Sequence, residues 1–133
     1  MQPAQANRMT EESGRVVSIV DDDASLRRSL RNLLTSAGLR VETFESAEVF
    51  LQSGSQDNTG CLVLDLRMPG MGGLGLLKRL AAAGSRIPVI VVTAHGDDDT
   101  RQRLLQAGAV AFLEKPVQGA ALVNAVRSAL TPA

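Results

Sequence analysis

The chain has 133 residues, with fourteen acidic and fourteen basic side chains and no formal net charge. This length suits a single domain with its own core, and the balanced charge argues against nucleic acid or a membrane surface as a direct partner. A single cysteine excludes an internal disulfide and a cysteine zinc site, and a free thiol favours a reducing cytoplasm.

The beginning of the chain differs in character from the rest. Residues 1–14 are polar and lack the apolar core of a signal peptide, so we expect a disordered leader there, with Met9 as an alternative start. The folded domain is predicted to cover residues 15–133. No apolar run approaches the ~20 residues of a membrane span.

Short apolar runs alternate with amphipathic segments along the remaining chain. The apolar runs predict strands over residues 16–20, 40–44, 61–65, 87–92 and 109–113. Apolar residues at helical spacing predict helices between Asp23 and Gly38 and over residues 46–51, 74–84, 100–107 and 117–130, with a polar loop at 53–60. This alternation predicts a doubly wound α/β domain with five parallel strands and helices on both faces of the sheet. The polar–apolar alternation of residues 40–44 places that strand at an edge.

Polar side chains stand where four of these strands end. Asp21 and Asp22 follow the first strand, and Asp65 ends an apolar strand that offers no packing reason for a carboxylate. Thr93 and Lys115 follow the fourth and fifth strands. Because an open parallel sheet binds ligands beyond the carboxyl ends of its strands, we expect these groups to share one site.

Three carboxylates in one site require positive charge nearby. Lys115 supplies one charge, and a hard divalent cation such as Mg²⁺, held by Asp21, Asp22 and Asp65, would supply more. Asp65 would then stay ionised and could act as a nucleophile toward phosphorus. The Thr93 hydroxyl and the Lys115 ammonium could each bind an oxygen of a phosphoryl group in transfer.

Several other residues admit two interpretations. Asp23 is interpreted as a helix cap rather than a metal ligand, and Cys61 as a buried thiol rather than a redox group. Phe112 is either a core residue or a switch. His95 is interpreted as an exposed loop residue, although it and Arg67 flank the site and could tune how long a phosphate is kept.

The motifs at the strand ends match a known pattern. They are Val20-Asp21-Asp22, Asp65 with Met68-Pro69 and Gly73, Thr93-Ala94, and Lys115-Pro116. Together they resemble the receiver domain of two-component response regulators, over residues 16–130. Residues 65–69, 93–97 and 114–116 are most similar to the FixJ-like transcriptional regulators of that family.

The resemblance implies a flavodoxin-like (βα)5 fold with strand order 2-1-3-4-5. It implies that Asp65 accepts phosphate from a sensor histidine kinase. Asp22 would bind Mg²⁺ directly, Asp21 through water, and Arg67 through its backbone carbonyl. Thr93 and Lys115 would bind the phosphoryl oxygens.

The resemblance also implies a switch. Phe112 occupies the place of the family's aromatic switch residue, and a cis peptide is expected before Pro116. Phosphorylation would move Thr93 and then Phe112, and would reshape the face formed by the helix at 100–107, the strand at 109–113 and the helix at 117–130. That face would bind an output partner or a second copy of the domain, giving a homodimer.

Two positions depart from the family pattern. Gly72 stands where relatives carry a polar or acidic residue, which makes the loop rich in glycine and indicates a mobile segment. Phe112 lacks the hydroxyl of the tyrosine that many relatives carry, so burial alone would drive its movement.

Two other functions remain open at this point. One is an aspartate-nucleophile phosphatase of the haloacid dehalogenase type, which needs a second aspartate where this chain has Arg67. The other is an interaction module that keeps the fold but needs no phosphate, and it predicts neither Mg²⁺ affinity nor labelling by acetyl phosphate. The favoured hypothesis is a cytoplasmic phosphorylatable switch in transcription regulation, and not an enzyme.

Overall fold

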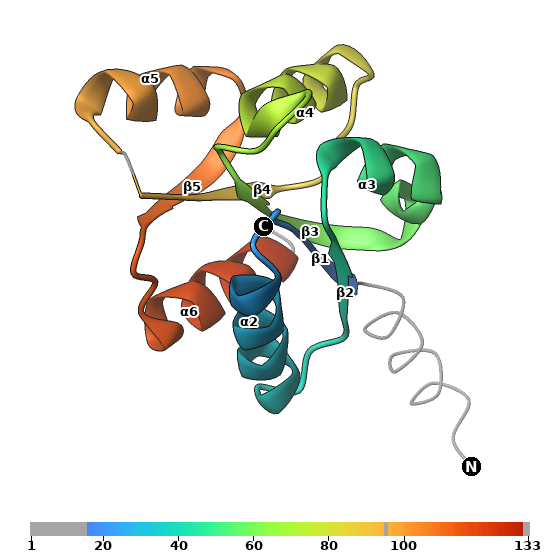
Figure 1. Ribbon diagram of the computed structural model, residues 1–133, viewed down its shortest axis with the longest axis vertical. Helices are drawn as coiled ribbons and strands as arrows, with labels where there is room; N and C mark the ends of the chain where they lie inside the picture. The colour runs from blue at the N-terminus through green and yellow to red at the C-terminus, as the bar shows by residue number, and fades with distance from the viewer. Residues whose placement is uncertain (1–15, 95, 132–133) are drawn as a thin grey trace.

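The computed structural model describes residues 16–94 and 96–131. The predicted leader at residues 1–14, and the interpretation of His95, therefore lie outside the described residues. One parallel sheet has the strand order β2-β1-β3-β4-β5, which confirms the flavodoxin-like order (Figure 1). Its strands are β1 (Val16–Val20), β2 (Val41–Phe44), β3 (Thr59–Asp65), β4 (Val89–Thr93) and β5 (Ala109–Glu114).

Helices cover both faces of the sheet. They are α2 (Ala24–Ser36), α3 (Ala47–Ser53), α4 (Gly72–Ala82), α5 (Asp98–Gln106) and α6 (Gly119–Leu130). Figure 1 shows the sheet nearly edge-on, with α3, α4 and α5 on one side and α2 and α6 on the other. The three predicted elements that would form the output face correspond to α5, β5 and α6.

Each face of the sheet has its own apolar core. Phe50, Leu76 and Leu104 belong to the cluster under α3, α4 and α5. Leu34 and Leu122 belong to the cluster under α2 and α6. All five side chains are almost completely buried, so the central strands are enclosed from both sides and their carboxyl ends are held in fixed positions.

The predicted polar loop at 53–60 is partly structured. It contains a short 3-10 helix, Ser55–Asn58, and β3 begins at Thr59, two residues earlier than predicted. The buried hydroxyls of Ser18 and Thr59 lie 2.7 Å apart and form a hydrogen bond. Because each polar group satisfies the other, the strand can begin with a threonine that its apolar pattern does not indicate.

The starts of α2 and α3 follow capping signals in the sequence. The Asp23 carboxylate accepts hydrogen bonds from the amides of Ser25 and Leu26, and Ser46 accepts one from Val49. β2 is an edge strand, as predicted. Among the described residues, no helix has both the length and the apolar character needed to cross a bilayer.

Asp23→Ala is expected to lower the free energy of unfolding by about 1 kcal/mol relative to Asp23→Asn, because asparagine keeps the capping oxygen. Both variants remove the same charge, so their difference reports the cap alone. Urea unfolding followed by circular dichroism measures it, and equal stability of the two variants would contradict a capping role.

Candidate functional site

Three carboxylates meet at the carboxyl edge of the sheet. Asp21 and Asp22 follow β1, and Asp65 is the last residue of β3. One oxygen from each lies within 4.8 Å of the others. Asp21 is only 2% exposed and Asp65 only 5%, whereas Asp22 faces solvent. The structure thus brings together the three residues that the sequence nominates, while their roles stay predictions.

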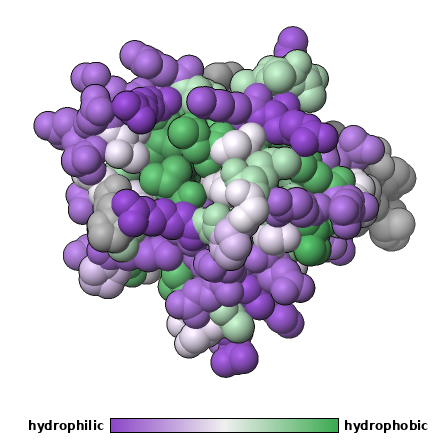
Figure 2. Space-filling view, turned by 45° about the horizontal axis from the view of Figure 1, so that its top comes forward, coloured by the Kyte–Doolittle hydropathy of each residue, from purple (hydrophilic) through white to green (hydrophobic). Residues whose placement is uncertain are grey.

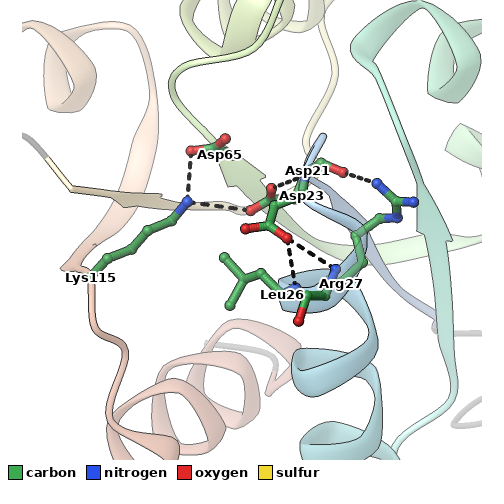
Figure 3. A network of polar contacts seen from close by, with 7 residues as sticks. Asp21, Asp23, Leu26, Arg27, Asp65 and Lys115 are labelled. Carbon is green, nitrogen blue, oxygen red and sulfur yellow. Dashed lines mark hydrogen bonds and ion pairs between the residues drawn. The ribbon is translucent and has the colours of Figure 1, made fainter.

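Lys115, the residue after β5, bridges the two buried carboxylates. Its Nζ lies 3.3 Å from Oδ1 of Asp65 and 3.6 Å from Oδ2 of Asp21 (Figure 3). The main-chain amide of Lys115 also donates to the carbonyl of Thr93 at 2.8 Å. Thr93 is buried, at 1% exposure. The two predicted phosphate-binding residues are therefore connected through the backbone, beside Asp65.

Burial is the largest influence on the pKa values of Asp65 and Asp21. It raises the pKa of Asp65 above 3.8, and the Asp21 charge raises it further, while Lys115 and the Arg67 amide lower it. The pKa of Asp21 is also raised, by burial first, against a hydrogen bond from the Asp23 amide and the charge of Lys115. One lysine does not fully compensate two buried carboxylates, which is the condition that favours a bound cation.

Arg27 also contacts the site, although the sequence indicates only a solvent-facing helix residue. Its Nη1 donates to the main-chain carbonyl of Asp21 at 2.6 Å, one turn into α2 (Figure 3). The Asp23 amide donates to Oδ1 of Asp21 at 2.8 Å. The backbone and the side chain of Asp21 are thus both held. The only sequence signal was the position of Arg27 one helical turn beyond the acidic run.

The loop after β3 packs tightly against the strand end. The Gly73 amide donates to the carbonyl of Leu66 at 3.0 Å, and a Cβ at this position would overlap the Asp65 carbonyl. This close approach to the Asp65 carbonyl leaves no room for a side chain, which explains why residue 73 is glycine. Arg67 is exposed on the loop, two residues beyond Asp65.

Phe112 is half-buried and joins the cluster under α3, α4 and α5. Gly96 packs so closely on its ring that a side chain there would overlap it. The guanidinium carbon of Arg101 lies 5.9 Å from the ring centroid, in cation–π range. Phe112 therefore lies between the loop after β4 and helix α5. The Lys115–Pro116 peptide is cis, as expected.

Cys61 lies on β3 within the core. Its side chain is completely buried, and burial raises the pKa of its thiol to about 12. The thiol therefore stays protonated at neutral pH, which supports the interpretation of a packing residue.

The donor set suits Mg²⁺. With Mg–O distances of about 2.0–2.1 Å, two directly bound oxygens lie at most roughly 4 Å apart. The three carboxylate oxygens lie within 4.8 Å of one another, close enough for the cluster to hold one cation. Its oxygen-only character also matches this hard cation.

Two hollows among the described residues lie away from the acidic cluster, and a third adjoins it. One of about 740 Å³ lies at the opposite edge of the sheet and contains Gly60, Pro88 and Thr131. Another, of about 510 Å³, lies between α4 and α5, on a face where apolar side chains gather among polar ones (Figure 2). A third, of about 640 Å³, adjoins the site through Asp23 and Lys115.

Comparisons with known proteins agree with this geometry. Residues 17–127 match the family model described as the response regulator receiver domain. The chain is 47% identical over 114 residues to the transcriptional regulatory protein FixJ of Azorhizobium caulinodans, covering 86% of this chain and 54% of that protein. It is also 47% identical to nodulation protein W of Bradyrhizobium diazoefficiens, covering 86% of this chain and 50% of that protein.

Solved structures show the same similarity. The crystal structure of FixJ-N matches with a TM-score of 0.80 at 41% identity, covering 87% of this chain and 93% of that one. The response regulator StyR matches with a TM-score of 0.80 at 48% identity, covering 87% and 59%. The chain thus spans about half the length of the curated relatives it matches.

Asp65→Asn is expected to raise the free energy of unfolding of the metal-free chain at neutral pH, because it removes one of two buried carboxylates. Since the folded pKa of Asp65 is raised, the folded state binds a proton more tightly than the unfolded state. The contribution of Asp65 to the free energy of unfolding should therefore fall as the pH rises from 3.8 through the folded pKa, and the advantage of the variant over the wild type should shrink toward acid.

Chemical unfolding across this pH range measures the effect. Asp57→Asn, which removes an exposed carboxylate, is the matched control and should change little. A loss of stability in Asp65→Asn at neutral pH would show that the ion pair with Lys115 outweighs the cost of burial.

Proposed function

The chain belongs to the response regulator receiver domain family, and from that membership we propose that Asp65 accepts a phosphoryl group from a histidine kinase in a Mg²⁺-dependent step. The observation that carries this proposal is the meeting of Asp21, Asp22 and Asp65 with Lys115 at one edge of the sheet. No packing requirement of the fold explains three carboxylates there.

The transfer is a displacement at phosphorus. An Oδ atom of Asp65 attacks the phosphorus of a phosphohistidine, a P–O bond forms, and the P–N bond breaks with its electron pair left on the histidine nitrogen. Lys115 and the Thr93 hydroxyl bind phosphoryl oxygens. Asp22, Asp65 and the Arg67 carbonyl would hold Mg²⁺ directly and Asp21 through water, and the bound cation would supply positive charge to the phosphoryl oxygens.

The surface beside Lys115 supports a protein as the phosphate donor. The hollow of about 640 Å³ there contains Leu26, Leu33, Pro116 and Val117. Apolar side chains next to a charged site give a partner protein a surface to bury, while its phosphohistidine reaches Asp65. A small phosphate donor would need no such surface.

Phosphorylation then shifts the domain between two states. The aspartyl phosphate adds about 1.5 to 2 negative charges. Thr93 donates to the phosphoryl group, and Phe112, which lies between the loop after β4 and α5, moves into the space that is vacated. The face formed by α5, β5 and α6 thereby changes its affinity for an output partner or for a second copy of the domain.

Two exposed apolar residues support this face as the contact surface. Leu105 on α5 is 46% exposed, and Val110 on β5 is 57% exposed. Because the elements are neighbours, a homodimer through this face would bury both side chains. The output is transcription control in the cytoplasm, in keeping with the relatives named as transcriptional regulators.

The site is built to retain phosphate rather than to turn it over. An aspartate-nucleophile phosphatase needs a second aspartate two residues after its nucleophile as general acid, and this chain has Arg67 at that position. The domain is therefore a switch and not an enzyme with a small phosphate ester as its substrate.

Acetyl phosphate with Mg²⁺ is expected to add one phosphate group to the wild type and none to Asp65→Asn, because the amide is not a nucleophile. Intact-mass spectrometry measures this, with Asp57→Asn as the control that keeps its label. Chelation of Mg²⁺ should abolish labelling of the wild type. Equal labelling of Asp65→Asn would contradict the assignment of the phosphoacceptor.

Thr93→Ala is expected to take up one phosphate group more slowly than the wild type, because Thr93 binds a phosphoryl oxygen in the transfer. Once labelled, it should remain a monomer under conditions in which the labelled wild type dimerises, because the hydroxyl that reads the phosphoryl group is gone. Analytical ultracentrifugation before and after labelling measures this. Val110→Glu should also be labelled and remain monomeric, because its charge lies in the contact surface. Full dimerisation of labelled Thr93→Ala would count against the proposed switch.

A further inference from the structure

The loop from Asp65 to α4 is closed by the hydrogen bond from the Gly73 amide to the Leu66 carbonyl, but its middle contains two glycines. Gly70 and Gly72 both have positive φ, at +77° and +73°. Helix α4 begins after Met71 without any side chain that caps it from its own sequence. A glycine-rich connection and an uncapped helix start both leave the backbone free to adopt other conformations.

A carboxylate from a different helix supplies the missing contact. Oε2 of Glu48, in the first turn of α3, accepts a hydrogen bond from the Met71 amide at 2.8 Å. This bond lowers the pKa of Glu48, so the side chain is charged at neutral pH. The negative charge also faces the positive end of the α4 dipole. Glu48 therefore caps α4 from outside.

Gly70 leaves room for the hydrogen bond between Glu48 and the Met71 amide. A Cβ on Gly70 would lie 2.5 Å from Oε2 of Glu48, closer than two unbonded atoms can approach. The absence of a side chain at Gly70 thus lets the carboxylate reach the Met71 amide. An acidic side chain on α3 and a glycine in the loop together make one interaction.

The hydrogen bond between Glu48 and Met71 affects the acidic site through the segment that joins Asp65 to Met71. Asp65 is held by the sheet at one end of the loop, and Met71 is held by Glu48 at the other. The segment between them carries Arg67, whose amide hydrogen-bonds the Asp65 carboxylate. Its carbonyl is the proposed main-chain ligand of Mg²⁺. Movement of Met71 would therefore displace that segment.

We infer that Glu48 is a positioning residue, which holds the loop after β3 in the conformation that binds Mg²⁺ and retains the phosphoryl group on Asp65. This inference rests on the proposed phosphoacceptor function. It assigns to a side chain outside the acidic cluster the task of setting metal affinity and phosphate lifetime.

The test compares Glu48→Ala with Glu48→Gln. The alanine variant should bind Mg²⁺ roughly tenfold more weakly by isothermal titration calorimetry, the loss expected when one hydrogen bond to a charged group is removed. Glutamine keeps an acceptor oxygen and should recover most of the affinity. Glu45→Ala, which removes a nearby exposed carboxylate, should match the wild type.

A second readout follows the phosphoryl group itself. After labelling and removal of acetyl phosphate, intact-mass spectrometry gives the rate at which each variant loses its phosphate. We expect Glu48→Ala to lose its phosphate several-fold faster than the wild type, and Glu48→Gln to show a smaller increase in that rate. A merely stabilising contact would change the urea midpoint while leaving both Mg²⁺ affinity and phosphate lifetime unchanged, and that result would overturn the inference.

Gly70→Ala places a Cβ against Oε2 of Glu48 and also strains the backbone, because Gly70 has a positive φ. It should therefore weaken Mg²⁺ binding at least as much as Glu48→Ala, and unchanged Mg²⁺ affinity would overturn the inference. If Glu48→Ala does not fold, Gly70→Ala and Glu48→Gln carry the comparison.

The outcomes separate this inference from the proposed function. A wild type that neither binds Mg²⁺ nor becomes labelled would refute the proposed function. A wild type that does both, with Glu48→Ala indistinguishable from it, would refute the role of Glu48 alone.

Discussion

The repulsion between two carboxylates that are almost excluded from water shapes this molecule's functional edge. Asp21 and Asp65 face each other with only Lys115 between them, and the pKa of each is raised chiefly by burial. A fold selected for stability alone would replace such a pair by apolar residues. The proposed function gives this pair a role, because a bound cation would bring the positive charge that Lys115 alone does not supply.

The topology of the sheet creates this arrangement. β1 lies between β2 and β3, so the chain leaves β1 toward one side and later returns on the other. The crevice at this change of direction opens between the ends of β1 and β3, where Asp21 and Asp65 stand. β5 contributes Lys115 from further along the same edge, and the Lys115 amide is bound to the Thr93 carbonyl. A change at Asp65 is thereby connected to the strands that carry Thr93 and Phe112.

The strands, their carboxyl ends and the helix cap at Asp23 could be predicted because each is marked by neighbouring residues in the sequence. Apolar runs ending in Asp65 or Thr93 indicate strands and mark their carboxyl ends, and parallel pairing then requires those ends to meet. The cap at Asp23 was likewise readable from the residues beside it. Arg27 and Glu48 were not, since their partners are main-chain groups, the Asp21 carbonyl and the Met71 amide. The position of Arg27 one helical turn beyond the acidic run was its only signal, and Glu48 had none. The early start of β3 was missed for the same reason, because a hydroxyl 41 residues away satisfies Thr59.

The central claim is that Asp65 and its neighbours form a single site for Mg²⁺ and a phosphoryl group. A crystal structure grown with Mg²⁺ and beryllofluoride, a phosphoryl mimic, tests it most directly. The account predicts the mimic on an Oδ atom of Asp65, with Thr93 and Lys115 bound to its fluorides and a cation contacted by Asp22, Asp65 and the Arg67 carbonyl. Beryllofluoride bound elsewhere, or an Asp65 carboxylate that still contacts only Lys115 with both ligands in excess, would contradict it.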